Sequence, residues 1–249
     1  MSLKSLLNAH VLDKNTINGL FSYADPLQIA REIDDDLARM VCALFAYGNA
    51  RQIVKFLKTL DFSLINSSEE NITKSLKGYK YRFQNETDIK NIFITLRRFK
   101  LEYSIEELIL KGLEKGGIEH GINEIISKIL SLNNYMSSGY EFFFGRGFDE
   151  FATSPYKRYN MYFRWMVRDT DIDLGVFKKI DKSRLLMPLD VHTHRVSLKL
   201  GLIKRKSYDF KAVMELTNKL RSFDPLDPIK YDFALYRIGQ SKELEFMTR

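Results

Sequence analysis

Apolar side chains recur along most of this sequence at the three- and four-residue intervals that place them on one face of a helix. Leu37, Met40, Val41 and Leu44 follow this spacing within residues 31–48, and the stretch ends at Gly48, a residue type common at helix ends. The same spacing predicts further helices at residues 49–60, 67–76, 87–100, 103–113, 122–134, 159–168, 194–202, 210–223 and 229–240. No run alternates between apolar and polar residues as a half-buried strand does. The pattern therefore predicts an all-α fold with about ten helices.

Polar residues at helix starts support this assignment. Ser67 followed three positions later by Glu70, and Ser104 followed by Glu107, read as capping boxes, in which the two side chains bond reciprocally to backbone amides. The five prolines all lie where a predicted helix starts or stops, as the lost backbone N–H requires. The sequence shows no repeat at a fixed period and no low-complexity linker.

Composition narrows the class of protein. No apolar run approaches the roughly 20 residues that span a bilayer, and the first fifteen residues lack the apolar core of a signal peptide. Cys42 is the one cysteine, so the chain cannot form an internal disulfide or a cysteine-held zinc or iron–sulfur site. We therefore expect a cytoplasmic protein without a membrane partner. The net charge of +7 is compatible with a nucleic-acid partner, although a lysine-rich composition alone also accounts for it.

Residues 148–168, "FDEFATSPYKRYNMYFRWMVR", have the outline of two helices joined by a short turn. The turn of small residues ends at Pro155, and a second helix begins at Tyr156 and Lys157. Exposed amides at such a helix start can hold a phosphate without reading a base. A plain pair of antiparallel helices has the same outline, and from shape alone both interpretations stay open.

The stretch "MPLDVHTHRVSLKLGLI", residues 187–203, carries two histidines that suggest a metal site. His192 and His194 are two positions apart and therefore do not share a helix face, whereas two ligands on one helix suit a four-residue spacing. The spacing of Asp169, Asp171 and Asp173 suggests a calcium loop, but the glycine and glutamate that such a loop requires are missing. We therefore predict no metal site, and we expect His192 to pack or to hydrogen-bond within its domain.

Several segments resemble the helix-hairpin-helix superfamily of DNA glycosylases. Residues 189–202, "LDVHTHRVSLKLGL", resemble the catalytic aspartate segment of endonuclease III-like enzymes, and residues 153–163, "TSPYKRYNMYF", align with the end of their hairpin. "KRYNMYFRWM" and "YKYRFQN" resemble segments of type-two 8-oxoguanine glycosylases, and "YDFALYRIGQ" resembles the last helix before the cluster cysteines. The resemblance covers about residues 35–240. The whole chain also resembles a bacterial family of unknown function with segments similar to "YRFQN", "RWMVR", "PLDVH" and "DPIKYDFAL".

The resemblance implies a site and a reaction. The catalytic carboxylate aligns with Asp190 and the nucleophilic lysine of the lyase members with Lys157, while Asn160 aligns with an asparagine of the hairpin helix. Lys157 and Asp190 are 33 positions apart, a longer separation than in these enzymes. The predicted substrate is double-stranded DNA with a damaged or mismatched base, which the enzyme flips out of the stack and excises. No cofactor and no iron–sulfur cluster are expected.

The same resemblance implies two helical lobes with a central cleft. One lobe would comprise residues 36–165 and end in the hairpin, and the other would comprise residues 1–35 and 166–249. The expected contacts divide into a DNA-binding set and a base pocket, and core packing or turn support are the alternatives for each member. The DNA-binding set is Thr153, Ser154, Tyr156, Arg158 and Arg195. The base-pocket set is Trp165, Phe144 and His192.

Three interpretations stay open at this stage. The first is a cytoplasmic, nucleoid-associated DNA glycosylase, with or without AP-lyase activity. The second is a non-catalytic DNA-binding protein that retains the glycosylase fold, an interpretation favoured by Thr153 and Pro155, which replace the hairpin glycines. The third is a protein-interaction module. The base lesion and the oligomeric state cannot be predicted from the sequence.

Overall fold

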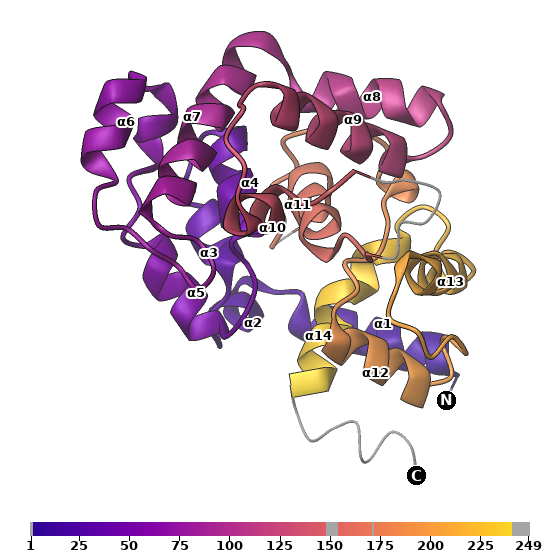
Figure 1. Ribbon diagram of the computed structural model, residues 1–249. Helices are drawn as coiled ribbons and strands as arrows, with labels where there is room; N and C mark the ends of the chain where they lie inside the picture. Colours follow the sequence, from indigo (N-terminus) through magenta and orange to yellow (C-terminus); the bar gives the residue numbers. More distant parts are fainter. Residues whose placement is uncertain (1, 148–153, 171, 241–249) are drawn as a thin grey trace. The chain divides into compact units, whose positions relative to one another are not determined.

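The computed structural model describes residues 2–147, 154–170 and 172–240. These residues form fourteen α-helices and three short 3-10 helices (Figure 1), and no β-strand occurs among them apart from an isolated bridge between Tyr81 and Gln84. The predicted all-α class is thus confirmed for the described chain. Within that part of the sequence, none of the helices combines the length and the apolar character that crossing a bilayer requires.

The chain folds into two compact units. Unit 1 consists of the described residues of 1–24 and 151–249, and unit 2 of those of 25–150. The sequence places its lobe boundary at residue 165, inside a helix that spans Lys157–Val167, but that whole helix belongs to unit 1. Each unit has its own apolar core, as an independent compact body requires.

Unit 2 is built around one helix that is buried on all sides. Every residue of α4 from Leu37 to Leu44 is buried, which is typical of a central core helix. The longer helices of the unit each bury one face, and α3 packs against α4 while α8 packs against α9. The elements of unit 2 are α3 (Pro26–Ala30), α4 (Asp36–Leu44), α5 (Ala50–Leu57), η1 (Phe62–Asn66), α6 (Glu69–Ser75), α7 (Glu86–Glu102), α8 (Ile105–Glu114), α9 (Ile118–Ser131) and α10 (Ser138–Phe144).

Two glycines allow α8 and α9 to approach each other closely, and the two helices lie side by side (Figure 1). A Cβ atom at Gly112 would lie 2.0 Å from the backbone nitrogen of Gly121, and one at Gly121 would lie 2.7 Å from the Cα of Ile109. Real Cβ atoms do not approach backbone this closely, so any larger residue would push the helices apart.

Unit 1 joins the beginning of the chain to its end. Helix α1 packs against α14 and η3, and Tyr231 Oη donates a hydrogen bond of 3.0 Å to Asn8 Oδ1. Helix α12 also packs against α14 (Figure 1). The elements of unit 1 are α1 (Leu3–Lys14), α2 (Ile17–Phe21), α11 (Lys157–Val167), η2 (Lys182–Arg184), α12 (Val191–Lys199), α13 (Phe210–Arg221), η3 (Pro228–Tyr231) and α14 (Asp232–Gln240).

The structure confirms one predicted helix cap and places the other one residue later in the sequence. Ser104 caps α8 as predicted and accepts from the Glu107 amide at 3.5 Å. The cap of α6 is Ser68 rather than Ser67, because the helix begins one residue later than the pattern suggests. A reciprocal capping box occurs instead at the start of α7, where Asn85 and Asp88 bond to each other's amides at 3.0 and 2.8 Å.

Candidate functional site

Helix α11 of unit 1 places a charged side chain, that of Arg164, in the core. Its residues from Tyr159 to Val167 are all buried, including the guanidinium of Arg164. A buried charge is costly unless it is paired, and Arg164 has two partners. Its Nη1 donates to Asp232 Oδ2 at 2.6 Å, and its Nη2 lies 3.0 Å from Asp173 Oδ1. Burial lowers the pKa of Arg164, but the two carboxylates outweigh this effect and raise it, so the side chain stays charged.

Arg168, at the end of the same helix, extends this pairing. Its Nε donates to Asp227 Oδ1 at 2.9 Å and its Nη2 donates to Asp227 Oδ2 at 3.0 Å, a bidentate pair, while its Nη1 bonds to Asp173. We refer to Arg164, Arg168, Asp173, Asp227 and Asp232 as the buried ion network. Three carboxylates thus face two guanidiniums inside unit 1.

The chain after α11 folds back onto the helix to deliver Asp173. The amide of Leu174 donates to the carbonyl of Trp165 at 2.7 Å, and the amide of Phe177 donates to the carbonyl of Met166 at 2.8 Å. This return shows how the long segment between Lys157 and Asp190 is accommodated, because part of it packs against α11 itself.

Asp190 is the N-cap of α12. Its Oδ1 accepts a hydrogen bond from the Thr193 amide at 2.7 Å, and the side chain is half-buried. Beside it, Tyr208 Oη donates to the carbonyl of Leu189 at 2.9 Å. Burial raises the pKa of Tyr208 to about 12, and the Asp190 carboxylate adds to this shift. The residues from Leu185 to Leu189 are buried, so the Asp190 carboxylate that follows them lies at the edge of an apolar region.

Lys157 is the first residue of α11 and is half-buried. Its Nζ donates to the sulfur of Met161 at 3.2 Å. Lys157, Met161 and Arg164 lie at positions i, i+4 and i+7 of the helix, so all three occupy one face. The face that carries the predicted nucleophile thus also carries the arginine that binds Asp232.

Asp232 lies within electrostatic reach of both predicted catalytic residues. Burial raises the pKa of Asp232 above its ordinary value and Arg164 opposes this rise. Asp190 raises the pKa of Asp232 further, whereas Lys157 lowers it. Lys157 and Asp190 thus both belong to unit 1, where each contributes to the electrostatic environment of Asp232. No direct ion pair between the two is found among the described contacts of unit 1.

The predicted DNA-binding residues lie around the starts of α11 and α12. Ser154 is exposed and its Oγ accepts from the Tyr156 amide at 3.3 Å, while Thr153 lies outside the described residues. Tyr156 has a left-handed backbone with φ of 47°, and α11 begins after it without a side-chain cap. Arg158 is half-buried, and Arg195 is exposed on α12.

The predicted base-pocket residues differ in exposure. Trp165 is buried in the core of unit 1 and Phe144 in the core of unit 2, and His192 is exposed on α12. His194 is buried instead, and its Nε2 donates to the carbonyl of Arg205 at 3.1 Å. Among the residues that the structure describes, no group of three His, Cys, Asp or Glu side chains is placed to hold a metal ion.

Unit 2 presents an exposed surface that we call the aromatic surface, formed by Tyr47, Arg82, Phe83 and Phe142. The Tyr47 and Phe83 rings are nearly parallel, with centroids 6.0 Å apart, and Phe142 meets Phe83 edge-on at 5.0 Å. Phe83 is 58% exposed, and the Arg82 guanidinium lies 5.5 Å from its ring centroid. Arg82 has a left-handed backbone with φ of 50°, a strained conformation shared in the described chain by one other non-glycine residue, Tyr156.

Buried hydrogen bonds hold this strained turn in place. Tyr81 and Gln84 exchange two backbone hydrogen bonds of 2.9 and 2.8 Å across Arg82 and Phe83. The Gln84 side chain accepts from the Tyr47 hydroxyl and donates to the carbonyl of Gly139 at 2.8 Å. The hydrogen bonds of Tyr81 and Gln84 therefore hold the turn in one position, and the side chains of Arg82 and Phe83 are exposed to solvent.

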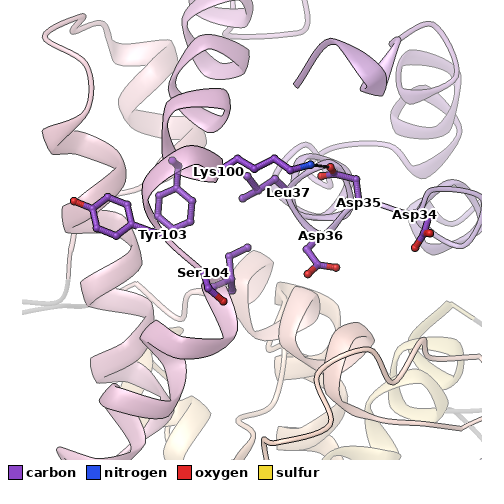
Figure 2. A pocket seen from close by; sticks show the side chains of 9 residues that line it. Asp34, Asp35, Asp36, Leu37, Lys100, Tyr103 and Ser104 are labelled. Atoms are coloured by element: carbon purple, nitrogen blue, oxygen red, sulfur yellow. Dashed lines mark hydrogen bonds and ion pairs between the residues drawn. The ribbon is translucent and has the colours of Figure 1, made fainter. Parts of the chain in front are cut away.

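An open hollow of about 290 Å³ lies elsewhere in unit 2, between the starts of α4 and α8 (Figure 2). Asp35 caps α4 and pairs with Lys100, and Asp34 and Asp36 pair with Arg39 at 3.6 and 3.4 Å. Burial raises the pKa of Asp36, against the opposing effect of Arg39. The lining acids thus already have cationic partners. The lining residues are Asp34, Asp35, Asp36, Leu37, Phe99, Lys100, Tyr103, Ser104 and Ile105.

The sequence patterns did not predict the buried ion network, although two charged residues in apolar surroundings pointed to it. Arg164 interrupts the apolar run "MYFRWMV", and Asp232 follows the apolar pair Ile229 and Tyr231 at a helix start. Charged residues are almost never fully buried without a partner, so an arginine inside an apolar helix implies a buried acid elsewhere. Which acid supplies the partner depends on tertiary contacts that the local pattern does not contain.

Comparison with known proteins places the chain in a family without assigning a role. No curated protein and no protein of solved structure matches the sequence. A family model described as "Protein of unknown function (DUF2400)" matches residues 25–241, a range that includes all of unit 2 and the whole of the buried ion network. The chain therefore belongs to the DUF2400 family.

Proposed function

We propose that this protein is a DNA glycosylase of the helix-hairpin-helix type, with an AP-lyase step at Lys157. The observation that carries the proposal is that Lys157, which begins α11, and Asp190, which caps α12, belong to one compact unit although 33 positions separate them in the sequence. The expected arrangement of two lobes with a central cleft and a nucleoid location belong to the same proposal. The resemblance of residues 189–202 and 153–163 to glycosylase segments supplies the reaction class.

The chemistry needs one carboxylate and one amine. Cleavage of the glycosidic bond builds positive charge on the sugar, and an ionised Asp190 would stabilise that charge. The neutral Lys157 amine would attack the anomeric carbon while the base leaves with the bonding electron pair. Loss of the amine proton and opening of the sugar ring at the C1′–O4′ bond would give a Schiff base, and removal of a C2′ proton with departure of the 3′-phosphate would then cut the strand by elimination. No cofactor takes part in these steps.

Two features of the described residues support a DNA partner. The first turn of α11 has no side-chain cap, so its backbone amides suit a phosphate oxygen, next to Ser154 and Arg158. The aromatic surface of unit 2 combines an exposed ring with a guanidinium, the pairing that stacks on an unpaired base. A net charge of +7 favours association with a polyanion through counterion release.

A borohydride trapping experiment tests the proposal. Wild-type protein incubated with abasic-site DNA should give a covalent complex on reduction, and Lys157→Ala should give none. Lys199→Ala, which removes a lysine from the last turn of α12 in the same unit, is the matched control and should trap as wild type does. If wild type forms no trapped complex, or if Lys157→Ala traps equally well, the nucleophile assignment is wrong.

A second candidate function is non-catalytic DNA binding. The contacts of Lys157 and Asp190 favour it, because the amine bonds to Met161 and the carboxylate caps α12, both ordinary structural roles. On this candidate the protein would bind DNA at low salt with an affinity that falls steeply as salt rises. It would release no base from any substrate in a lesion panel, which separates it from the glycosylase.

A further inference from the structure

A row of cations lies on one face of α5, and the proposed chemistry gives it no role. Arg51, Lys55 and Lys58 stand at positions i, i+4 and i+7, and all three side chains are exposed. Lys58 is the C-cap of the helix and still has helical backbone angles, so the row runs along the whole of α5. None of the three side chains forms an ion pair with a residue that the structure describes. We call these three residues the basic row.

The helix itself does not account for the basic row. Cations in the last turn interact favourably with the helix dipole, which explains Lys55 and Lys58. Arg51 lies in the first turn, where the dipole disfavours a cation, and residues 50–60 contain no Asp or Glu that would offset it. The row therefore suits an anion from outside the chain better than it suits the stability of α5.

Two contacts place the basic row beside the aromatic surface. The Phe56 ring of α5 stacks on the Tyr81 ring of the strained turn, with centroids 4.4 Å apart. A Cβ atom at Gly48 would lie 2.5 Å from Arg82 Nη1, so the guanidinium packs against the residue that precedes the Asn49 cap of α5. Arg82 thus lies at the end of α5 where the basic row begins.

The acids that flank this surface in the sequence do not neutralise it. Glu86 pairs with Lys90, and Asp88 is buried at 1% exposure. Asp61 follows α5 at the end away from Arg82, where it caps η1. The basic row and Arg82 therefore form a continuous positive surface next to the exposed rings.

We propose that the basic row and the aromatic surface form one binding site for single-stranded DNA, with phosphates along α5 and an unpaired base on the Phe83 ring. A positively charged track next to an exposed aromatic ring is the combination that binds single strands, because each unpaired base offers a π face to the ring. The bases of a duplex are stacked on one another and offer no such face. The choice of DNA rests on the proposed function, whereas the site depends only on contacts within unit 2.

The dependence of binding on salt tests the basic row. Binding of a fluorescein-labelled oligothymidylate is measured by anisotropy at several salt concentrations. The triple variant Arg51→Gln, Lys55→Gln, Lys58→Gln should bind more weakly at low salt. It should also lower the slope of log affinity against log salt by about two, since each phosphate contact on a single strand contributes about 0.7.

A second triple variant is the matched control for net charge. Lys4→Gln, Lys111→Gln, Lys211→Gln removes three exposed lysines from α1, α8 and α13, all outside the basic row. This variant loses the same charge and should keep the slope of wild type within about 0.7. A basic-row variant with the slope of wild type, or a control variant that loses as much slope, would overturn the proposal.

An oligomer without bases tests the stacking. Wild type should bind the oligothymidylate at least about fivefold more tightly than a tetrahydrofuran oligomer of the same length, which keeps the phosphates and lacks the bases. Phe83→Leu keeps apolar area without a π face and should bind the two oligomers with similar affinity. It should bind a blunt duplex as wild type does, because no base is unpaired there. A Phe83→Leu protein that keeps the full preference for bases would overturn the proposal.

Other ligands and the proposed function are tested separately. Tighter binding of oligouridylate than of oligothymidylate would overturn the choice of DNA. Binding of phosphatidylserine vesicles that requires the basic row, without binding of oligothymidylate, would overturn a nucleic-acid partner. Wild type that is trapped on abasic-site DNA, while both surface variants bind oligothymidylate normally, overturns this inference alone. Wild type that binds oligothymidylate through this surface but is never trapped overturns only the proposed lyase step.

Discussion

Arg168 and Asp227 form a bidentate ion pair inside unit 1, with Nε–Oδ1 and Nη2–Oδ2 distances of 2.9 and 3.0 Å. The Arg168 side chain is 2% exposed, so water contributes little to its solvation. Two parallel hydrogen bonds fix both the distance and the orientation of the two groups. The pair therefore ties the end of α11 to the loop that precedes η3, which is the segment that leads into α14.

Removal of one partner should cost far more than removal of both. Arg168→Met leaves Asp227 and part of Asp173 as buried charges without their cation, and we expect a loss of about 3–5 kcal/mol in the free energy of unfolding. Urea unfolding followed by circular dichroism measures this loss. Arg195→Met, which replaces an exposed arginine of α12, is the control and should change stability by less than about 0.5 kcal/mol.

A double variant separates the effect of an uncompensated buried charge from the effect of lost packing. Arg168→Met combined with Asp227→Leu replaces the pair by apolar side chains and leaves one fewer uncompensated carboxylate than Arg168→Met alone. The double variant should therefore recover part of the lost stability. A double variant that is less stable than Arg168→Met would contradict this explanation and would point to packing as the source of the effect.

The fold could be predicted only where apolar residues repeat with the helical period along the sequence. Helices such as α7 and α13 have a continuous apolar stripe, and the pattern predicts both within two residues at each end. It misses helices α1, α2, α3 and α10, because α2 and α3 have only five residues, α10 has seven, and α1 buries only Leu7. These helices are stabilised by tertiary contacts, such as Asn15 Nδ2 donating to the carbonyl of Lys230 at 2.8 Å.

The candidate site was predictable only in part for the same reason. Asp190 could be found because a helix cap and a glycosylase-like segment coincide at one place in the sequence. Its relation to Lys157 depends on the return of residues 174–177 onto α11, which no local motif specifies. The partner of Arg164 lies 68 positions away at Asp232, a separation that only the folded chain closes.

The Arg205–Asp209 pair predicts a dependence of stability on pH. Asp209 caps α13 through the Ala212 amide at 3.0 Å and accepts from Arg205 Nε at 2.7 Å. The hydrogen bond from Arg205 lowers the pKa of Asp209 to about 2, against an opposing effect of burial. A carboxyl whose pKa is lower in the folded than in the unfolded chain stabilises the fold above the unfolded pKa, and this contribution is lost as the pH falls through the folded value.

Asp209→Asn tests this prediction, because asparagine can still cap α13 but does not pair with Arg205 as an anion. Wild type should be more stable than the variant near pH 6, by no more than about 1 kcal/mol, because solvent screens a partly exposed pair. The difference should shrink as the pH falls from about 4 to about 2. The same comparison in an Arg205→Gln background is the control and should depend less on pH. A difference that stays constant down to about pH 2 would show that the pair contributes nothing.

The aromatic surface of unit 2 predicts a loss of binding without a loss of stability. Phe83 is 58% exposed, so Phe83→Ala leaves no large cavity and should change the melting temperature little. If Phe83 stacks on an unpaired base, the substitution should weaken binding of abasic-site DNA by about 1–3 kcal/mol, or roughly 5- to 150-fold. Fluorescence anisotropy with labelled DNA at fixed low salt measures the change. Leu101→Ala is the matched control, since Leu101 is a 72% exposed apolar residue of α7 outside this surface.

The Leu101→Ala control shows whether a loss of DNA binding comes from lost stacking or from lost apolar surface in general. Equal losses for Phe83→Ala and Leu101→Ala would show that exposed apolar area alone matters, and the aromatic surface would lose its special role. Phe83→Tyr keeps the ring and should bind nearly as wild type does, whereas Phe83→Leu keeps apolar area without a π face and should bind like Phe83→Ala. Because Arg82 contacts the same ring, Arg82→Gln should lower affinity and also reduce its dependence on salt.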